Sequence, residues 1–345
     1  MTLLRRRRRR AVDRVAASAA RFWSWWEGAR ASVATAFDAG ATGRVRELVE
    51  PRIRRYHRDL TWHVGHGTQA RLMLVVSGAR HPALRGAAER WRMAGPADDT
   101  EWEYHAAFPP EPSAFDARVR VGDADLDPAQ AVAMVTADDR RYRMDLLLHH
   151  PRFDAISELA RDRIARALVG WALGEDEIDR WVGQVAVTQT PPIDPVPVRT
   201  LASVTGQLAE RWGGVRWATL EGSFDDLRLI AEVRHPLHRV DYPLFDEHIA
   251  VRLPYSDSEP DGLPDQRALA DLKEFEEVLL GRLRSDALLV AHQTASGERL
   301  LHFYADSASR RAYAIRRLLQ KYLWPLASVH AEYDPGWQRI DHLRA

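Results

Sequence analysis

The sequence contains no cysteine, which excludes disulfide bonds, thiolate nucleophiles and zinc sites built on cysteine. It has only two lysines, Lys273 and Lys321, so arginine supplies nearly all of its positive charge. The 49 basic and 49 acidic residues cancel, so no long-range field attracts nucleic acid or an anionic membrane. No segment approaches the roughly 20 consecutive apolar residues of a membrane-spanning helix. These absences favour a soluble cytoplasmic protein.

Short catalytic motifs are lacking as well. The chain has no G-x-S-x-G, no phosphate-binding loop, no G-x-G-x-x-G after a strand and no H-E-x-x-H. His57, His63 and His66 lie near the start of a predicted strand, but no carboxylate completes a metal site there. A calcium-like run at 257–262 has Ala268 where a glutamate ligand is needed. We therefore expect no metal and no cofactor, and the sequence assigns no catalytic residue.

Residues 1–20 are predicted to form a basic arm, disordered at its start, because Arg5–Arg10 is an unbroken arginine run near the N-terminus. Contact with phosphate or anionic lipid is the alternative role of this run. A helix is predicted over 11–39, with Phe22, Trp25 and Trp26 on one face and Trp23 off it. Tryptophan buries a large area, so anchoring in a core is favoured over stacking on a ligand.

Residues 21–190 are predicted to form an N-terminal α+β domain. The spacing of apolar residues predicts helices at 44–58, 82–92 and 156–173, and strands at 72–76, 102–107, 131–136, 142–149 and 184–188. Four prolines within 191–199 predict a stiff linker. The order of these elements is similar to that of the C-terminal part, so the two domains are expected to share their topology in outline.

Residues 200–345 are predicted to form a ferredoxin-like C-terminal domain. Its elements follow the order strand, helix, strand, strand, helix, strand, at 248–253, 265–283, 287–294, 299–305, 307–322 and 326–332. Two such units give a split β-α-β fold. A preceding hairpin, 215–221 and 227–233, is expected to extend or cover the sheet. The predicted fold class of the whole chain is therefore α+β.

A family resemblance rests on motifs in this C-terminal part. These are Gly262-Leu263-Pro264, Gly297-x-Arg299, Phe303-Tyr304 and Asp334-Pro335-x-Trp337. In order and spacing they resemble the bacterial family called domain of unknown function 695, over residues 217–340. That family is in turn similar to the regulator of ribonuclease E activity B, a protein inhibitor of a ribonuclease. The resemblance implies a link to RNA metabolism, and it supplies no catalytic residues.

A candidate binding surface follows from the alternation of side chains along the C-terminal strands. Residues on the face away from the predicted helices include His248, Arg252, His302, Tyr304, His330 and Glu332. In the predicted fold the first strand lies between the third and the fourth, which brings His248 close to Tyr304 and His330. This polar face is the candidate ligand-binding surface. The favoured interpretation is a face that is simply solvated, or covered by the preceding hairpin or the N-terminal domain, since position in a fold alone does not imply function.

The sequence therefore predicts a non-catalytic cytoplasmic protein that binds or regulates through protein contacts. Its expected partner is another protein; RNA is a second partner class, which the zero net charge does not support. No membrane contact is expected, and the sequence contains no signal for an oligomeric state. The alternative function is a hydrolase with a carboxylate and histidine site between the two domains.

Overall fold

The computed structural model describes residues 2–122, 124–224, 227–322, 324 and 326–343, with side chains from residue 17 onward except that of residue 224. Helices and strands are both abundant, which confirms the α+β class. The chain divides into two compact units, residues 10–213 and residues 214–345 together with 1–9. In the described residues, no helix combines the length and apolar character needed to cross a membrane.

The first part of the N-terminal unit is a three-stranded sheet packed with three helices. The strands, in the order β1-β2-β3, are β1 (Thr61–His66), β2 (Leu72–Ser77) and β3 (Trp102–His105). The helices are α1 (Thr2–Asp38), α2 (Thr42–Tyr56) and α3 (Pro82–Met93). β1 runs antiparallel to β2, and β3 runs parallel to it. Every residue of the central strand β2 is buried, as its continuous apolar run predicts.

Two predictions for the N-terminal helix need correction. Arg5–Arg10 lie within the backbone helix α1 rather than in a disordered arm, and the segment has good helix formers and no proline or glycine. Trp23 is buried together with Phe22 and Trp26, and its Nε1–H donates to the backbone oxygen of Trp91 at 2.7 Å. α1 packs into a core shared by α2, α3 and the sheet, so more than one stripe of it is covered. The aromatic cluster therefore anchors the core.

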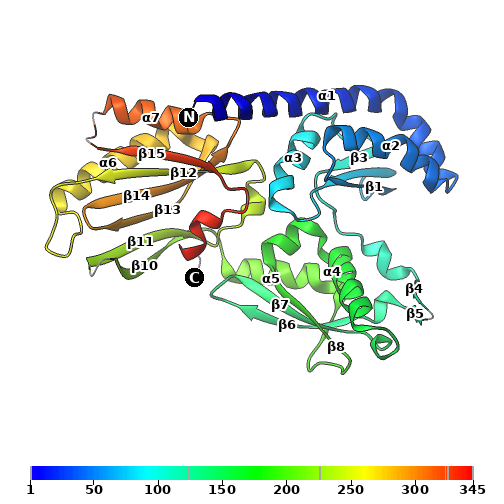
Figure 1. Cartoon of the computed structure of the whole chain (residues 1–345). Coiled ribbons are helices and arrows are strands. Elements are labelled where there is room, and N and C mark those ends of the chain that lie inside the picture. Colours follow the sequence, from blue (N-terminus) through cyan, green and yellow to red (C-terminus); the bar gives the residue numbers. More distant parts are fainter. Residues whose placement is uncertain (1, 123, 225–226, 323, 325, 344–345) are drawn as a thin grey trace. The chain divides into compact units, whose positions relative to one another are not determined.

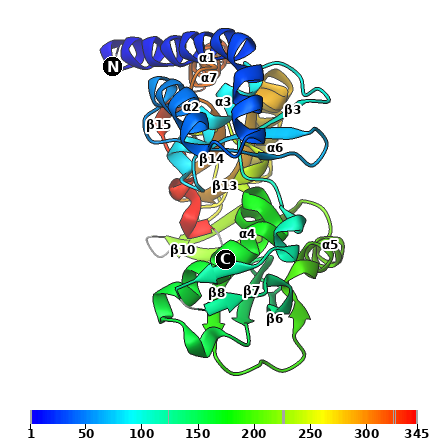
Figure 2. The ribbon, with the colours of Figure 1, turned by 90° about the vertical axis from the view of Figure 1, so that its right-hand side faces the viewer.

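The second part of the same unit contains a four-stranded sheet. Its order is β8-β7-β6-β9, from β6 (Val132–Asp138), β7 (Arg143–His149), β8 (Val182–Thr188) and β9 (Val196–Pro197). α4 (Glu158–Trp181) and α5 (Leu201–Trp212) pack against it, and Figure 2 shows α4 beside β7 and β8. A small hairpin, β4 (Val119–Val121) with β5 (Ala124–Leu126), precedes the sheet. The side chains that were predicted to face inward from the second strand, Tyr142, Met144, Leu146 and Leu148, are buried in this core.

The N-terminal unit does not share the topology of the C-terminal part, contrary to the prediction. Its two larger sheets are separate, and each contains a parallel pair of strands. The proline-rich segment is also more integrated than a linker, because β9 pairs with β6 and Val198 is fully buried. Proline is compatible with such an edge strand. The compact units accordingly divide after Gly213 rather than within 191–199.

The C-terminal unit is built on a six-stranded sheet in which all neighbouring strands are antiparallel (Figure 1). Its order is β10-β11-β13-β14-β12-β15, from β10 (Arg216–Phe224), β11 (Leu227–His235), β12 (Phe245–Pro254), β13 (Ala287–Ala295), β14 (Glu298–Asp306) and β15 (Ser328–Tyr333). β12 lies between β14 and β15, as predicted, and the β10–β11 hairpin extends the sheet beyond β13. The turn of this hairpin, 225–226, lies outside the described residues.

The two faces of this sheet are covered by different parts of the chain. α6 (Gln266–Leu283) and α7 (Arg311–Lys321) pack on one face, where the predicted inward residues Ile249, Val251, Leu253, Leu301 and Phe303 are buried. The C-terminal segment from Trp337 to Leu343 packs on the opposite face, against Tyr304 and residues of β11 and β13. Part of the face that we predicted to be open is therefore a second core.

Candidate functional site

The six residues predicted to form a ligand-binding face do not converge on one open site. His248, His302 and Tyr304 are buried, with 4%, 4% and 0% of their surfaces exposed. Arg252 and His330 are exposed. The half of this face near Tyr304 is covered by the C-terminal segment from Trp337 to Leu343, which the sequence did not predict as the cover.

A chain of hydrogen bonds links the two buried histidines. His248 Nε2 and His302 Nδ1 share a hydrogen bond at 3.0 Å, and His302 Nε2 shares one with Gln293 Oε1 at 3.0 Å. The Gln293 amide continues the chain to His342 Nε2 at 3.2 Å. Burial lowers the pKa of His248 to about 4, and burial together with neighbouring histidines lowers that of His302 to about 3. Both rings are neutral at pH 7, which is the state that this chain requires.

The motif Asp334-Pro335-x-Trp337 turns the chain back onto the sheet. The Tyr304 hydroxyl donates to Asp334 Oδ2 at 2.6 Å, and the same carboxylate accepts the N–H groups of Gln338 and Arg339. Trp337 stacks on Tyr304 with ring centroids 4.3 Å apart, and its Nε1–H donates to the Phe245 carbonyl oxygen. These contacts hold the C-terminal segment over the sheet, so the motif has a structural role.

The other motifs of the resemblance form turns that meet each other. Gly262 and Gly297 both have a positive φ, 82° and 75°, which glycine adopts without steric cost. The Gly297 N–H donates to the Gly262 carbonyl oxygen at 3.1 Å, and the Tyr255 hydroxyl donates to the same oxygen at 2.8 Å. The two motifs therefore join the loop before α6 to the β13–β14 hairpin.

A charged cluster on the helix-covered face was not predicted. The Arg299 guanidinium, 8% exposed, lies 3.2 Å from a carboxylate oxygen of Glu276 on α6 and donates to Thr294. His292 lies between Glu276, at 3.1 Å, and Glu232. Burial acts to lower the pKa of His292, but the two carboxylates outweigh it and raise the pKa above its ordinary value. Alternation from Leu301 to Arg299 places the arginine on the helix side, and that signal could have identified the cluster.

Two of the remaining predicted residues, Arg252 and Glu332, take part in ion pairs. Arg252 forms a bidentate ion pair with Glu298, with N–O distances of 2.9 and 3.0 Å. Glu332 pairs with Arg339 at 2.5 Å and lies 3.9 Å from His248 Nδ1. These carboxylates are neutralised within the C-terminal unit, and nothing in their arrangement selects a nucleophile or a general base. Among the described residues, no group of three or more histidines, aspartates and glutamates is placed to hold a metal ion.

The N-terminal unit contains an open groove of about 910 Å³ between α2 and β1, which lie side by side in Figure 1. One wall is a single face of α2, with Thr42, Val45, Arg46, Glu50 and Arg54. The other wall is formed by residues 60–64 and His66 of β1 and its approach. The end of α1 closes the groove near His66, whose ring makes an edge contact with Phe37. No sequence motif indicated this groove, because helix and strand form it only when they pack together.

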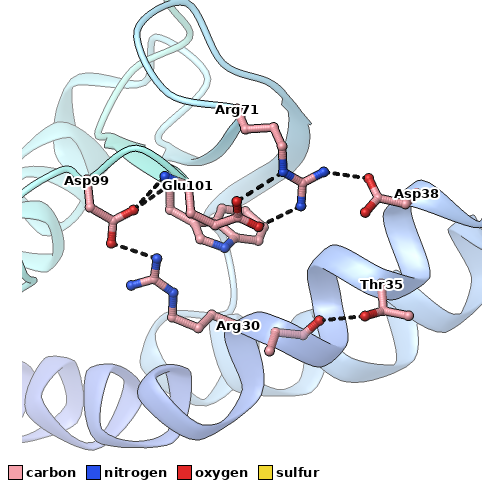
Figure 3. A network of polar contacts seen from close by, with 8 residues as sticks. Arg30, Thr35, Asp38, Arg71, Asp99 and Glu101 are labelled. Atoms are coloured by element: carbon pink, nitrogen blue, oxygen red, sulfur yellow. Dashed lines mark hydrogen bonds and ion pairs between the residues drawn. The ribbon is translucent and has the colours of Figure 1, made fainter.

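A network of ion pairs fixes the end of α1 that borders the groove (Figure 3). Asp38, which lines the groove, accepts a hydrogen bond from Arg71 at 2.7 Å. Arg71 also forms a bidentate ion pair with Glu101. About two turns of α1 further back, Arg30 pairs with Asp99 at 2.6 Å. α1 is thereby tied to the segments that begin β2 and β3, so this end of the groove is held in place.

The described residues thus form an α+β fold with an open groove in one unit and polar residues bonded to each other in the other. Residues 216–343 match the model of a family described as a family of unknown function, DUF695. The predicted resemblance is thus confirmed for the C-terminal part. No curated protein and no solved structure matches the chain.

Proposed function

We propose that this protein is a non-catalytic binding or regulatory protein that acts through protein contacts, and that the groove between α2 and β1 is its contact site. The observation that carries the proposal is the groove itself, because it combines an exposed helix face with the edge of a sheet. Sheet edges and helix-lined grooves are recurrent sites of protein recognition.

The C-terminal unit supports this proposal by the way its polar residues are used. His248 and His302 share a hydrogen bond, Tyr304 bonds to Asp334, and the motifs of the family resemblance shape turns. We infer that this unit is a stable scaffold. The resemblance to the regulator of ribonuclease E activity B that we inferred from the sequence motifs suggests RNA metabolism in the cytoplasm as the setting, with a protein rather than RNA in direct contact.

A photo-crosslinking amino acid in place of Arg46, inside the groove, tests the contact site in living cells. The same substitution at Arg55, an exposed residue of α2 that does not line the groove, is the matched control. We expect discrete crosslinked adducts from position 46 and none from position 55. Equal adducts from both positions, or none from either, would contradict a groove-centred function.

A broad panel of hydrolase substrates separates the binding protein from the hydrolase. The proposal predicts no turnover by the purified chain. Turnover that a single carboxylate substitution abolishes would instead establish an enzyme, and the binding proposal would then be wrong.

A further inference from the structure

We propose that the groove binds an extended segment of a partner protein, which pairs with β1 as a fourth strand of the sheet and places an acidic side chain opposite Arg46. This inference rests on the proposed function and names the ligand class of the same site. Four properties of the groove support it: its position on the strand edge, the composition of β1, its free charge and its length.

The groove runs along the outer edge of β1. Trp62 and Val64 point to the core side of the strand, whereas Thr61 and His63 point to the other side, yet all four line the groove. Only a groove that follows the edge contacts both sets of side chains. Among the described strands, β2 alone pairs with β1, so half of the backbone N–H and C=O groups of β1 point into the groove. These groups are the hydrogen-bonding partners that an added strand requires.

The composition of β1 does not oppose the addition of a strand. Natural edge strands often contain lysine, carboxylate or proline residues, which prevent unwanted pairing with another chain. β1 has none of these residues. The edge strands of the C-terminal sheet differ, because β10 carries Arg216 and Glu221, and β15 carries Glu332. The edge of β1 is therefore open to pairing with another chain.

The free charge in the groove is positive. Glu50 is neutralised by Arg54 at 2.7 Å, and Asp38 is neutralised by Arg71 at 2.7 Å. Arg46 is exposed, and it has no hydrogen bond or ion pair with any residue that the structure describes. It lies four residues after Thr42 and eight before Arg54, so it belongs to the N-terminal half of the helical wall. An aspartate or glutamate of the ligand would complete this charge balance.

The dimensions of the groove suit a short extended segment. Its helical wall from Thr42 to Arg54 spans about 18 Å at 1.5 Å per residue. The six residues of β1 span about 20 Å at 3.3 Å per residue. A strand of about six residues matches both walls. Trp62, half-buried beside the groove, offers an apolar contact for a side chain of that strand.

Selection from a random peptide library against the full chain tests the ligand class. Random peptides of about ten residues are long enough to cover β1. We expect enrichment of peptides with an acidic residue among β-branched and aromatic residues. Recovery of no specific peptide, or of peptides without an acidic residue, would overturn the proposal. A positive crosslink at position 46 would still support the proposed function in that case, so the two failures are distinguishable.

The enriched peptide is then measured by fluorescence anisotropy with charge-reversal variants. Arg46→Glu should weaken binding about fivefold or more, and a peptide with lysine in place of its acidic residue should restore binding to this variant. Arg55→Glu, the matched control on the same helix, should leave the affinity unchanged. N-methylation should abolish binding at alternate peptide residues only, because strand pairing uses every second N–H. Loss at every position or at none, or self-association of the chain through the groove, would overturn the proposal.

Discussion

His248 Nε2 and His302 Nδ1 lie 3.0 Å apart on the adjacent strands β12 and β14, and one of these two nitrogens must be unprotonated for the bond to exist. Both rings are buried, so the protonated form of either ring costs solvation energy, and protonation of the nitrogen that accepts the shared hydrogen bond also breaks that bond. This relationship makes the C-terminal unit sensitive to acid.

We expect the free energy of unfolding to fall as the pH decreases from about 6.5 towards 4. The folded-state pKa values, about 4 for His248 and about 3 for His302, lie below the unfolded value of 6.5. The unfolded chain therefore takes up protons first, at a cost of about 1.4 kcal/mol per pH unit for each histidine. Urea unfolding at several pH values measures how steeply the free energy of unfolding changes with pH, which is the slope compared below. Replacement of His302 with glutamine should reduce the slope, whereas His330→Gln, on an exposed residue of the same sheet, should not.

Tyr304→Phe should lower the free energy of unfolding by about 2 kcal/mol, because it removes a hydrogen bond from a buried hydroxyl to the Asp334 carboxylate. Tyr313→Phe is the control, since Tyr313 is 54% exposed and should change stability by less than about 0.5 kcal/mol. Equal effects of the two substitutions would mean that the Tyr304–Asp334 bond does not hold the C-terminal segment in place.

Arg299→Ala should destabilise the chain by about 3 kcal/mol, because Glu276 remains largely buried with only His292 as its partner. Arg252→Ala removes an exposed pair with Glu298 and should cost less than about 1 kcal/mol. Thermal and urea unfolding compare the two variants. A larger effect of Arg252→Ala would contradict the assignment of Arg299 and Glu276 to the interior.

Limited proteolysis should cut within 190–195, where Ile193 is 81% exposed, and not within 196–201, where Val198 and Leu201 are buried. β9 and α5 belong to the N-terminal core, so a fragment that starts at residue 200 exposes the apolar face of α5. We expect that fragment to aggregate more than one that starts at residue 214. The reverse order of solubility would restore 191–199 as the domain boundary.

Local patterns predicted much of the C-terminal fold. Alternation along β12 separates Ile249, which packs under the helices, from His248, which points to the opposite face. It could not predict that this opposite face is half covered, because the cover depends on the turn at Asp334 and the stacking of Trp337 on Tyr304. The contacts of Tyr304 with Asp334 and Trp337 join residues 30 or more positions apart, so no local pattern indicates them.

The N-terminal unit shows the same limit. Proline density in 191–199 predicts an extended segment, and the segment is extended, but Val196 and Val198 make it part of a sheet and its core. The groove depends on α2 packing beside β1, and the role of Arg46 depends on which charges already have partners. Residue types alone do not reveal such pairings.

The most direct measurement of the central claim is hydrogen exchange of the full chain with and without the selected acidic peptide. Strand addition predicts that alternate amides of β1, within 61–66, exchange at least about tenfold more slowly when the peptide is bound, because they gain hydrogen-bond partners. Amides of β12 and β14 around His248 and His302 should exchange at unchanged rates. Protection of the C-terminal sheet with no change in β1 would contradict the account and return the binding site to the face predicted from the sequence.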